Sequence, residues 1–131
     1  MNVPENLYYS KEHEWVEVKG NVVRVGITDY AQESLGDIVF VELPQVGDTL
    51  SAGDVLGVIE SIKSASDIYA PVSGKVVSVN EAILDEPQDV NNDPYNKGWL
   101  LEVEMDNQDE VNDLMNAFQY LQLVKEEKGE E

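Results

Sequence analysis

The sequence contains no cysteine, so it cannot form a disulfide, offer a thiolate nucleophile or bind a metal through thiolates. Any redox sulfur that the protein uses must come from another molecule. Histidine occurs once, at His13, and a lone imidazole makes neither a metal site nor an acid–base dyad, so we interpret His13 as structural. The glycines follow no phosphate-loop pattern, which argues against a nucleotide site.

Basic side chains are also scarce. The 131 residues include 8 Lys and Arg against 27 Asp and Glu, which gives a formal net charge of -19 and a pI near 4.1. A field of this sign repels phosphate backbones, so we expect no nucleic-acid partner. It favours a protein that meets partners with basic docking faces, although solvation of the surface accounts for the charge equally well.

Long apolar runs are absent too. No stretch approaches the roughly 18 consecutive apolar residues of a membrane span, and Met1–Leu7 has neither the basic nor the apolar part of a signal peptide. We expect no membrane contact, and a location in a bacterial cytoplasm, or in the mitochondrial matrix if the chain is a processed eukaryotic protein. The length predicts a single domain over residues 1–131, which we expect to be monomeric.

What the sequence does contain is a series of short segments rich in β-branched residues, separated by turn residues. The predicted strands are 15–18, 22–27, 38–43, 55–62, 68–79 and 99–103, with a hairpin turn at 19–21. Between them we predict a short helix that starts after Thr28 and ends at Gly36, another over 80–84, and an ordered loop over 85–98. Close spacing leaves little room for crossover helices, so the fold class is mainly β, an antiparallel sandwich or flattened barrel.

The end of the chain has a different pattern. Apolar residues recur near helical spacing over about 107–124, with acidic residues in the early turns, which predicts a C-terminal amphipathic helix that packs on the sheet. Residues 125–131 are charged and include Gly129, so we expect a frayed tail.

Lys63 is the basic residue that stands apart, because it is the only one between Arg24 and Lys75. It lies in a predicted turn over 60–67 whose other side chains are mostly small, and strands flank it on both sides. A lysine at a hairpin tip is most often a solvated surface residue. Here the small neighbours leave the amine accessible and the strands fix its place, which favours covalent attachment by a modifying enzyme.

This turn resembles the lipoyl-attachment signature of the glycine cleavage system H protein family, in the run ESIKSASD at 60–67 followed by APVSG at 70–74. Four further stretches resemble the same family, namely SKEHEW at 10–15, GITDYAQ at 26–32, LGDIVFVELP at 35–44 and NNDPYNKGW at 91–99. The five motifs occur in the family's order and extend over most of the chain. They imply a fold of the lipoyl and biotinyl hybrid-motif type.

The resemblance implies that lipoate is bound covalently to Lys63, and that the protein is a carrier without catalytic residues. In that family the arm takes the aminomethyl group of glycine from a pyridoxal-phosphate glycine decarboxylase to a tetrahydrofolate-dependent aminomethyltransferase. Its dithiol then goes to dihydrolipoamide dehydrogenase. These three enzymes and the lipoylating enzymes are the implied partners, and the cofactor supplies the chemistry while the protein supplies position.

An amine carried by the arm is a cation, which carboxylates near its resting place would hold. Glu14 and Asp67 are the candidates for this docking, because both lie within motifs of the resemblance and Asp67 is close to Lys63 in sequence. Two alternatives stay open. The chain could be an H-like protein that relays lipoate to other complexes, or an unmodified acidic interaction module.

Overall fold

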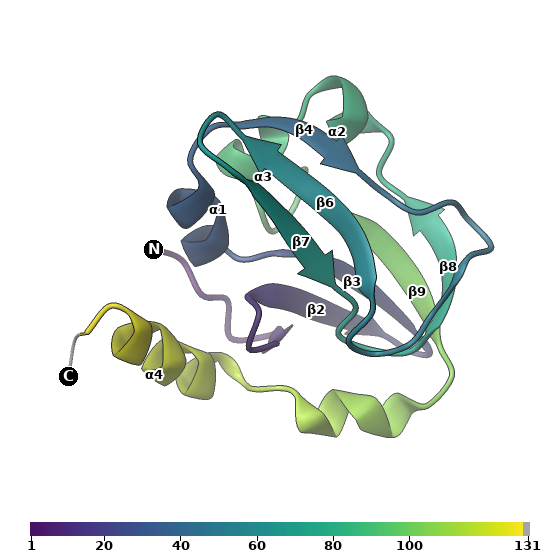
Figure 1. The fold of residues 1–131 in the computed structure, drawn as a ribbon. Helices are drawn as coiled ribbons and strands as arrows, with labels where there is room; N and C mark the ends of the chain where they lie inside the picture. The colour runs from purple at the N-terminus through teal and green to yellow at the C-terminus, as the bar shows by residue number, and fades with distance from the viewer. Residues whose placement is uncertain (130–131) are drawn as a thin grey trace.

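Two antiparallel sheets form the body of the protein in the computed structural model, which describes residues 1–129 (Figure 1). The larger sheet has six strands in the order β1-β2-β3-β9-β8-β5, and the smaller has three in the order β4-β6-β7. The strands are β1 Tyr8–Tyr9, β2 Glu14–Lys19, β3 Val22–Ile27, β4 Ile38–Glu42, β5 Thr49–Leu50, β6 Val55–Ser61, β7 Ala65–Tyr69, β8 Gly74–Val79 and β9 Leu101–Met105. Apolar side chains of both sheets share one buried cluster, so the predicted antiparallel sandwich is confirmed.

The hairpin of β2 and β3 shows how alternation builds this core. Val16 lies opposite Val25, and both are fully buried, while Arg24 lies opposite Glu17 on the other face. Side chains alternate between the two faces of a strand, so the valines point into the sandwich and the charged residues point to water. Gly20, at a φ of +67°, makes the tight turn that joins the strands.

The predicted strand over 68–79 is wrong as a single element. β7 ends at Tyr69 and β8 begins at Gly74, and the two strands belong to different sheets. Pro71 lies in the connection, where it can make no ladder hydrogen bond because proline has no backbone N–H. The chain therefore crosses from one layer of the sandwich to the other at this point. The two-residue strands β1 and β5 were not predicted.

The predicted helix after Thr28 is confirmed as α1, Asp29–Leu35, and Gly36 follows its last residue. The Thr28 hydroxyl accepts a hydrogen bond from the backbone N–H of Ala31 at 3.2 Å, as a helix cap does. Two one-turn helices follow β8, α2 at Ala82–Asp85 and α3 at Asp89–Asn92. The segment 85–98 therefore contains helix as well as loop, because burial of Val90 holds one turn of α3 in place.

The predicted C-terminal helix is confirmed as α4, but its predicted extent of about 107–124 is wrong. A 3-10 helix spans Gln108–Asp113, and α4 spans Ala117–Glu127 after an extended break. The break exists because Met115 exchanges two backbone hydrogen bonds of 2.8 Å with Tyr9, which uses groups that a continuous helix needs. The predicted frayed tail is helical at its start, since α4 includes residues 125–127, while residues 130–131 lie outside the described part.

A second, smaller core joins α4 to the larger sheet. Its centre is the pair Tyr9 and Tyr120, whose rings stack with centroids 4.6 Å apart, and Trp15 lies buried beside them. This places the C-terminal helix along the lower edge of the body in Figure 1, with its end near α1. No helix within residues 1–129 is long and apolar enough to cross a membrane.

Candidate functional site

The turn between β6 and β7 carries Lys63 at its tip, and Ser61 holds the turn closed. The Ser61 hydroxyl accepts hydrogen bonds from the backbone N–H groups of Lys63 at 3.2 Å and of Ser64 at 3.1 Å. Its backbone N–H donates to the Ser64 carbonyl at 2.7 Å. A small hydroxyl residue placed before the lysine therefore fixes the backbone that displays it, through local bonds of the kind that serine readily makes.

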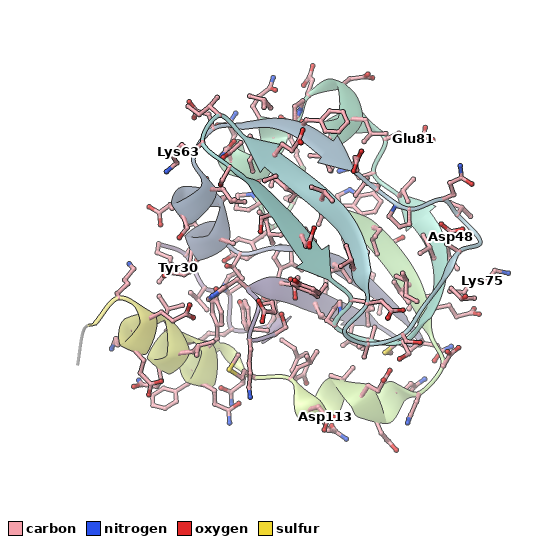
Figure 2. The ribbon with its side chains drawn as sticks, viewed as in Figure 1. Tyr30, Asp48, Lys63, Lys75, Glu81 and Asp113 are labelled. Carbon is pink, nitrogen blue, oxygen red and sulfur yellow. The ribbon has the colours of Figure 1, made fainter. Side chains whose placement is uncertain are left out.

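The Lys63 side chain is exposed and makes no ion pair within the described residues. Its Nζ donates one long hydrogen bond of 3.5 Å, to the backbone carbonyl of Ser34 in the last turn of α1. In Figure 2 the side chain projects from the tip of the turn beside α1. The amine is thus neither buried in the core nor neutralised by a carboxylate, so an enzyme can reach it.

The stem of Lys63 crosses Gly36, and this glycine is needed for two reasons. Its backbone has a φ of +82° and a ψ of -157°, a region that side-chain-bearing residues avoid. A Cβ at this position would lie 2.9 Å from Lys63 Cε. The loop is braced from below, because the Asn91 side-chain amide donates to the Gly36 carbonyl and its oxygen accepts from the Ile38 N–H, both at 2.9 Å.

A cleft of about 460 Å³ is lined by Ser34, the residue whose carbonyl accepts from the Lys63 amine. One side is α1 and the other is β7, and the turn before β2 and the last turn of α4 complete it. The lining residues are Glu12, His13, Ile27, Tyr30, Ala31, Ser34, Leu35, Ala65, Ser66, Asp67, Ile68, Tyr69 and Glu127. A lining that combines apolar side chains with carboxylates suits an apolar chain that ends in a cation.

The structure brings Asp67 to this cleft but places Glu14 next to it. Asp67 is exposed on β7 and lines the cleft directly. Glu14 is 1% exposed and lines a neighbouring hollow of about 270 Å³, which shares Glu12 and Tyr69 with the cleft. The two predicted docking carboxylates therefore line two different hollows, which share Tyr69.

Glu14 is the carboxyl whose chemistry the fold changes most. Burial raises its pKa to about 7, and nearby Glu12 adds to this effect, while hydrogen bonds from the Ser10 hydroxyl at 2.5 Å and the Tyr69 N–H at 3.3 Å act in the opposite direction. A carboxyl with this pKa is only partly ionised near neutral pH. A cation that reached the hollow would favour the ionised form.

Sequence reasoning missed several residues of the site. Ser34 and Gly36 support the lysine stem, and Glu127 reaches the cleft from the far end of the chain. The glycine had a detectable signal, since it follows a predicted helix, but nothing in the sequence places it beneath Lys63. Glu127 had none, because it lay within the predicted tail and an acidic chain places carboxylates almost everywhere.

Comparison with known proteins gives consistent matches over nearly the full length. Residues 7–127 match the family model described as glycine cleavage H-protein. The chain is 59% identical over 125 residues to the glycine cleavage system H protein of Carboxydothermus hydrogenoformans, covering 95% of this chain and 96% of that protein. It is 58% identical over 127 residues to the protein of the same description from Thermoanaerobacter sp., covering 97% and 100%.

The fold has a matching solved structure as well. A crystal structure of a glycine cleavage system H protein from Mycobacterium marinum superposes with a TM-score of 0.87 at 42% sequence identity. The match covers 93% of this chain and 98% of the other. The two-sheet architecture and its arrangement of helices are therefore shared with that protein.

Proposed function

Because this chain belongs to the glycine cleavage H-protein family, we propose that it carries lipoate in amide linkage to Nζ of Lys63. The chain is a carrier component of the glycine cleavage system and is not itself a catalyst, and its family is one that carries lipoate. The observation that supports Lys63 as the attachment point is its exposed, unpaired amine at the tip of a turn that Ser61 closes.

The surroundings of Lys63 fit a lipoyl chain. Gly36 leaves a cradle for the lysine stem, since a Cβ there would fill it, and Leu35 and Ile68 offer apolar contacts along the cleft. Asp67 lies four positions beyond Lys63, on β7, whose first residue Ala65 also lines the cleft. An octanoyl-length extension of the lysine side chain can follow this strand.

When bound, lipoate would supply a dithiolane able to accept the aminomethyl group of glycine, and it would become a dithiol once that group had passed to the next enzyme's acceptor. The chain's own residues do the rest. The turn displays the amide link, Ser34 offers a carbonyl to its N–H, and the cleft offers carboxylates to a cation and excludes part of the surrounding water. The absence of cysteine leaves no thiol in the chain to exchange with the dithiolane.

We propose Asp67 and Glu14 as the residues that hold the amine, in that order along its path. Asp67 on the cleft lining meets the arm first. Glu14 lines the neighbouring hollow and becomes available only if the amine enters it, where burial strengthens an ion pair. The proposed partners are glycine decarboxylase, aminomethyltransferase, dihydrolipoamide dehydrogenase and lipoylating enzymes. A net charge of -19 supports partners with basic docking faces.

The attachment is tested by intact-mass measurement of protein purified from its own host, followed by peptide mapping. A lipoyl-amide increment on Lys63 is expected, and its absence in every preparation would favour the unmodified interaction module. Lys63→Arg keeps the positive charge but offers no amine for the same acylation, so it should abolish glycine exchange with the decarboxylase. Lys75→Arg, at another exposed lysine, is the matched control and should leave exchange unchanged.

The docking role is tested by the rate at which the loaded arm loses its amine to water. Asp67→Asn should raise this rate about three- to tenfold, because a charge-assisted hydrogen bond becomes a neutral one. Glu33→Gln removes an exposed carboxylate of α1 that does not line the cleft, and should leave the rate unchanged. Equal rates for wild type and Asp67→Asn would remove Asp67 from the proposal. Glycine decarboxylation by this chain alone would contradict the carrier role.

A further inference from the structure

The last turn of α4 forms one wall of the cleft through Glu127. The earlier turns of this helix are held by buried side chains, among them Tyr120 and Val124. Beyond Val124, residues 125–129 are exposed, and none of them is anchored in the core. Two contacts hold this end of the helix: His13 Nε2 lies 3.0 Å from Glu127 Oε2, and the Lys128 ammonium lies 5.5 Å from the Tyr30 ring centre.

His13 is itself held in an unusual conformation. Within residues 1–129 it is the one non-glycine residue with a positive φ, at +71°. Its N–H donates to the Ser10 carbonyl at 3.2 Å and its carbonyl accepts from the Thr28 N–H at 3.0 Å, so the backbone is bound on both sides. A strained residue persists only where its surroundings hold it, and such residues are typical of functional sites.

The ring of His13 joins two helices through its two nitrogens. Nδ1 lies 2.8 Å from the Tyr120 hydroxyl, which in turn lies 2.6 Å from the Thr28 hydroxyl at the start of α1. The ring also packs against Tyr30, with centroids 5.0 Å apart, and Tyr30 lines the cleft. One side chain therefore connects the end of α4, the start of α1 and the wall of the cleft.

The two ring nitrogens of His13 contact different parts of α4. Nδ1 lies 2.8 Å from the hydroxyl of Tyr120, which is buried, and Nε2 lies 3.2 Å from Oε1 of Glu127. Because one imidazole makes both contacts, the ring links the anchored part of α4 to its last turn.

We propose that His13 is a positioning residue for the lipoyl arm: it fixes the last turn of α4 as a wall of the cleft and presents the Glu127 carboxylate to the amine that the arm carries. This inference rests on the proposed carrier function. It assigns the loaded arm a carboxylate from α4 that faces the cleft together with Asp67 of β7.

The first test uses the unmodified full chain and needs no lipoate. His13→Asn suits the left-handed backbone, since asparagine tolerates it, and it keeps a polar atom near the position of Nδ1 but has none near Nε2. Hydrogen exchange of the backbone amides of residues 125–128 should become about three- to tenfold faster, while β2 and β3 keep their protection. Glu126→Gln, on the same turn and outside the cleft lining, is the control and should exchange as wild type does.

The second test separates position from charge in the lipoylated protein. Glu127→Gln keeps an oxygen that accepts from Nε2, so amide exchange should stay near wild type, but the loaded arm should lose its amine about three- to tenfold faster. Glu127→Ala should change both readouts. A double variant of His13→Asn with Glu127→Ala should be no worse than either single change, because the two residues act through one contact.

Two results would overturn the inference. One is wild-type exchange and wild-type amine retention in His13→Asn with an unchanged circular dichroism spectrum. The other is additive effects of His13→Asn and Glu127→Ala. Absence of lipoate from Lys63 in the intact mass would contradict the carrier proposal instead, and the exchange measurement on the unmodified chain would still decide whether His13 fixes α4.

Discussion

Replacement of Glu14 by glutamine should change the free energy of unfolding in a pH-dependent way. The difference between the variant and wild type should favour the variant more at pH 8 than at pH 5. Burial raises the pKa of Glu14 from an ordinary 4.5 to about 7. A carboxyl whose pKa is higher in the folded state does not lower the free energy of unfolding at a pH below the pKa that it has in the unfolded chain. It destabilises the fold progressively as the pH rises from about 4.5 to about 7, because the unfolded chain gives up its proton first.

The size of the effect follows from these two pKa values. The two-state linkage expression gives a wild-type penalty of about 0.8 kcal/mol at pH 5 and about 3 kcal/mol at pH 8. Glutamine has no such pH dependence, and its amide can accept from the Tyr69 N–H and donate to the Ser10 hydroxyl. Any constant cost of the substitution cancels in the comparison, so Glu14→Gln should gain about 2 to 2.5 kcal/mol between pH 5 and pH 8.

Urea denaturation of both proteins at the two pH values measures this difference, and the midpoint should move by about 1 to 2 M. Glu33→Gln is the control, since Glu33 is exposed on α1. The same Glu14→Gln protein, once lipoylated, should lose the amine from its loaded arm faster at pH 8, because the buried carboxylate is gone. A stability difference that does not grow between pH 5 and pH 8 would refute the reasoning from burial.

Three further substitutions, with Gly20→Asn as a control, test the contacts that position the site. Gly26→Ala should lower the free energy of unfolding, measured by urea titration, by about 2 to 3 kcal/mol, because its Cβ would lie 2.5 Å from the Trp15 ring. Gly20 has a positive φ and open space around it, so Gly20→Asn should lower it by under about 1 kcal/mol. Asn91→Ala removes the brace beneath Gly36 and should cost about 2 kcal/mol by urea denaturation, and an unchanged midpoint would show that the brace is dispensable. Asn116→Ala breaks the capping box of α4 and should cost about 1 kcal/mol in thermal unfolding, with equal melting temperatures as the contrary result.

Local patterns in the sequence determined much of the fold. The alternation of apolar residues along β2 and β3, the threonine cap of α1 and the glycine after it each operate over a few residues, so they are legible without tertiary contacts. The accessibility of Lys63 is of this kind as well, because it follows from a short turn with small neighbours that the Ser61 hydroxyl closes.

Other features depend on contacts between distant parts of the chain. The break before α4 exists because Tyr9 pairs with Met115, over a hundred positions later. Hydrophobic periodicity does not show that the backbone N–H and C=O of Met115 bond to a distant residue and not within a helix. The split of 68–79 into two strands depends on which sheet each half joins. Sequence pattern predicted strand character there but could not assign it to a layer.

The site divides in the same way. The sequence by itself identified Lys63 as the candidate attachment residue. It also gave Glu14 and Asp67 as candidate carboxylates for docking the amine. Tertiary structure alone decided that Asp67 lines the cleft, that Glu14 is buried in a neighbouring hollow, and that His13 and Glu127 meet across the fold. The reason is physical: a turn is built from neighbouring residues, whereas a cleft and the pKa of a buried carboxyl arise from residues that only folding brings together.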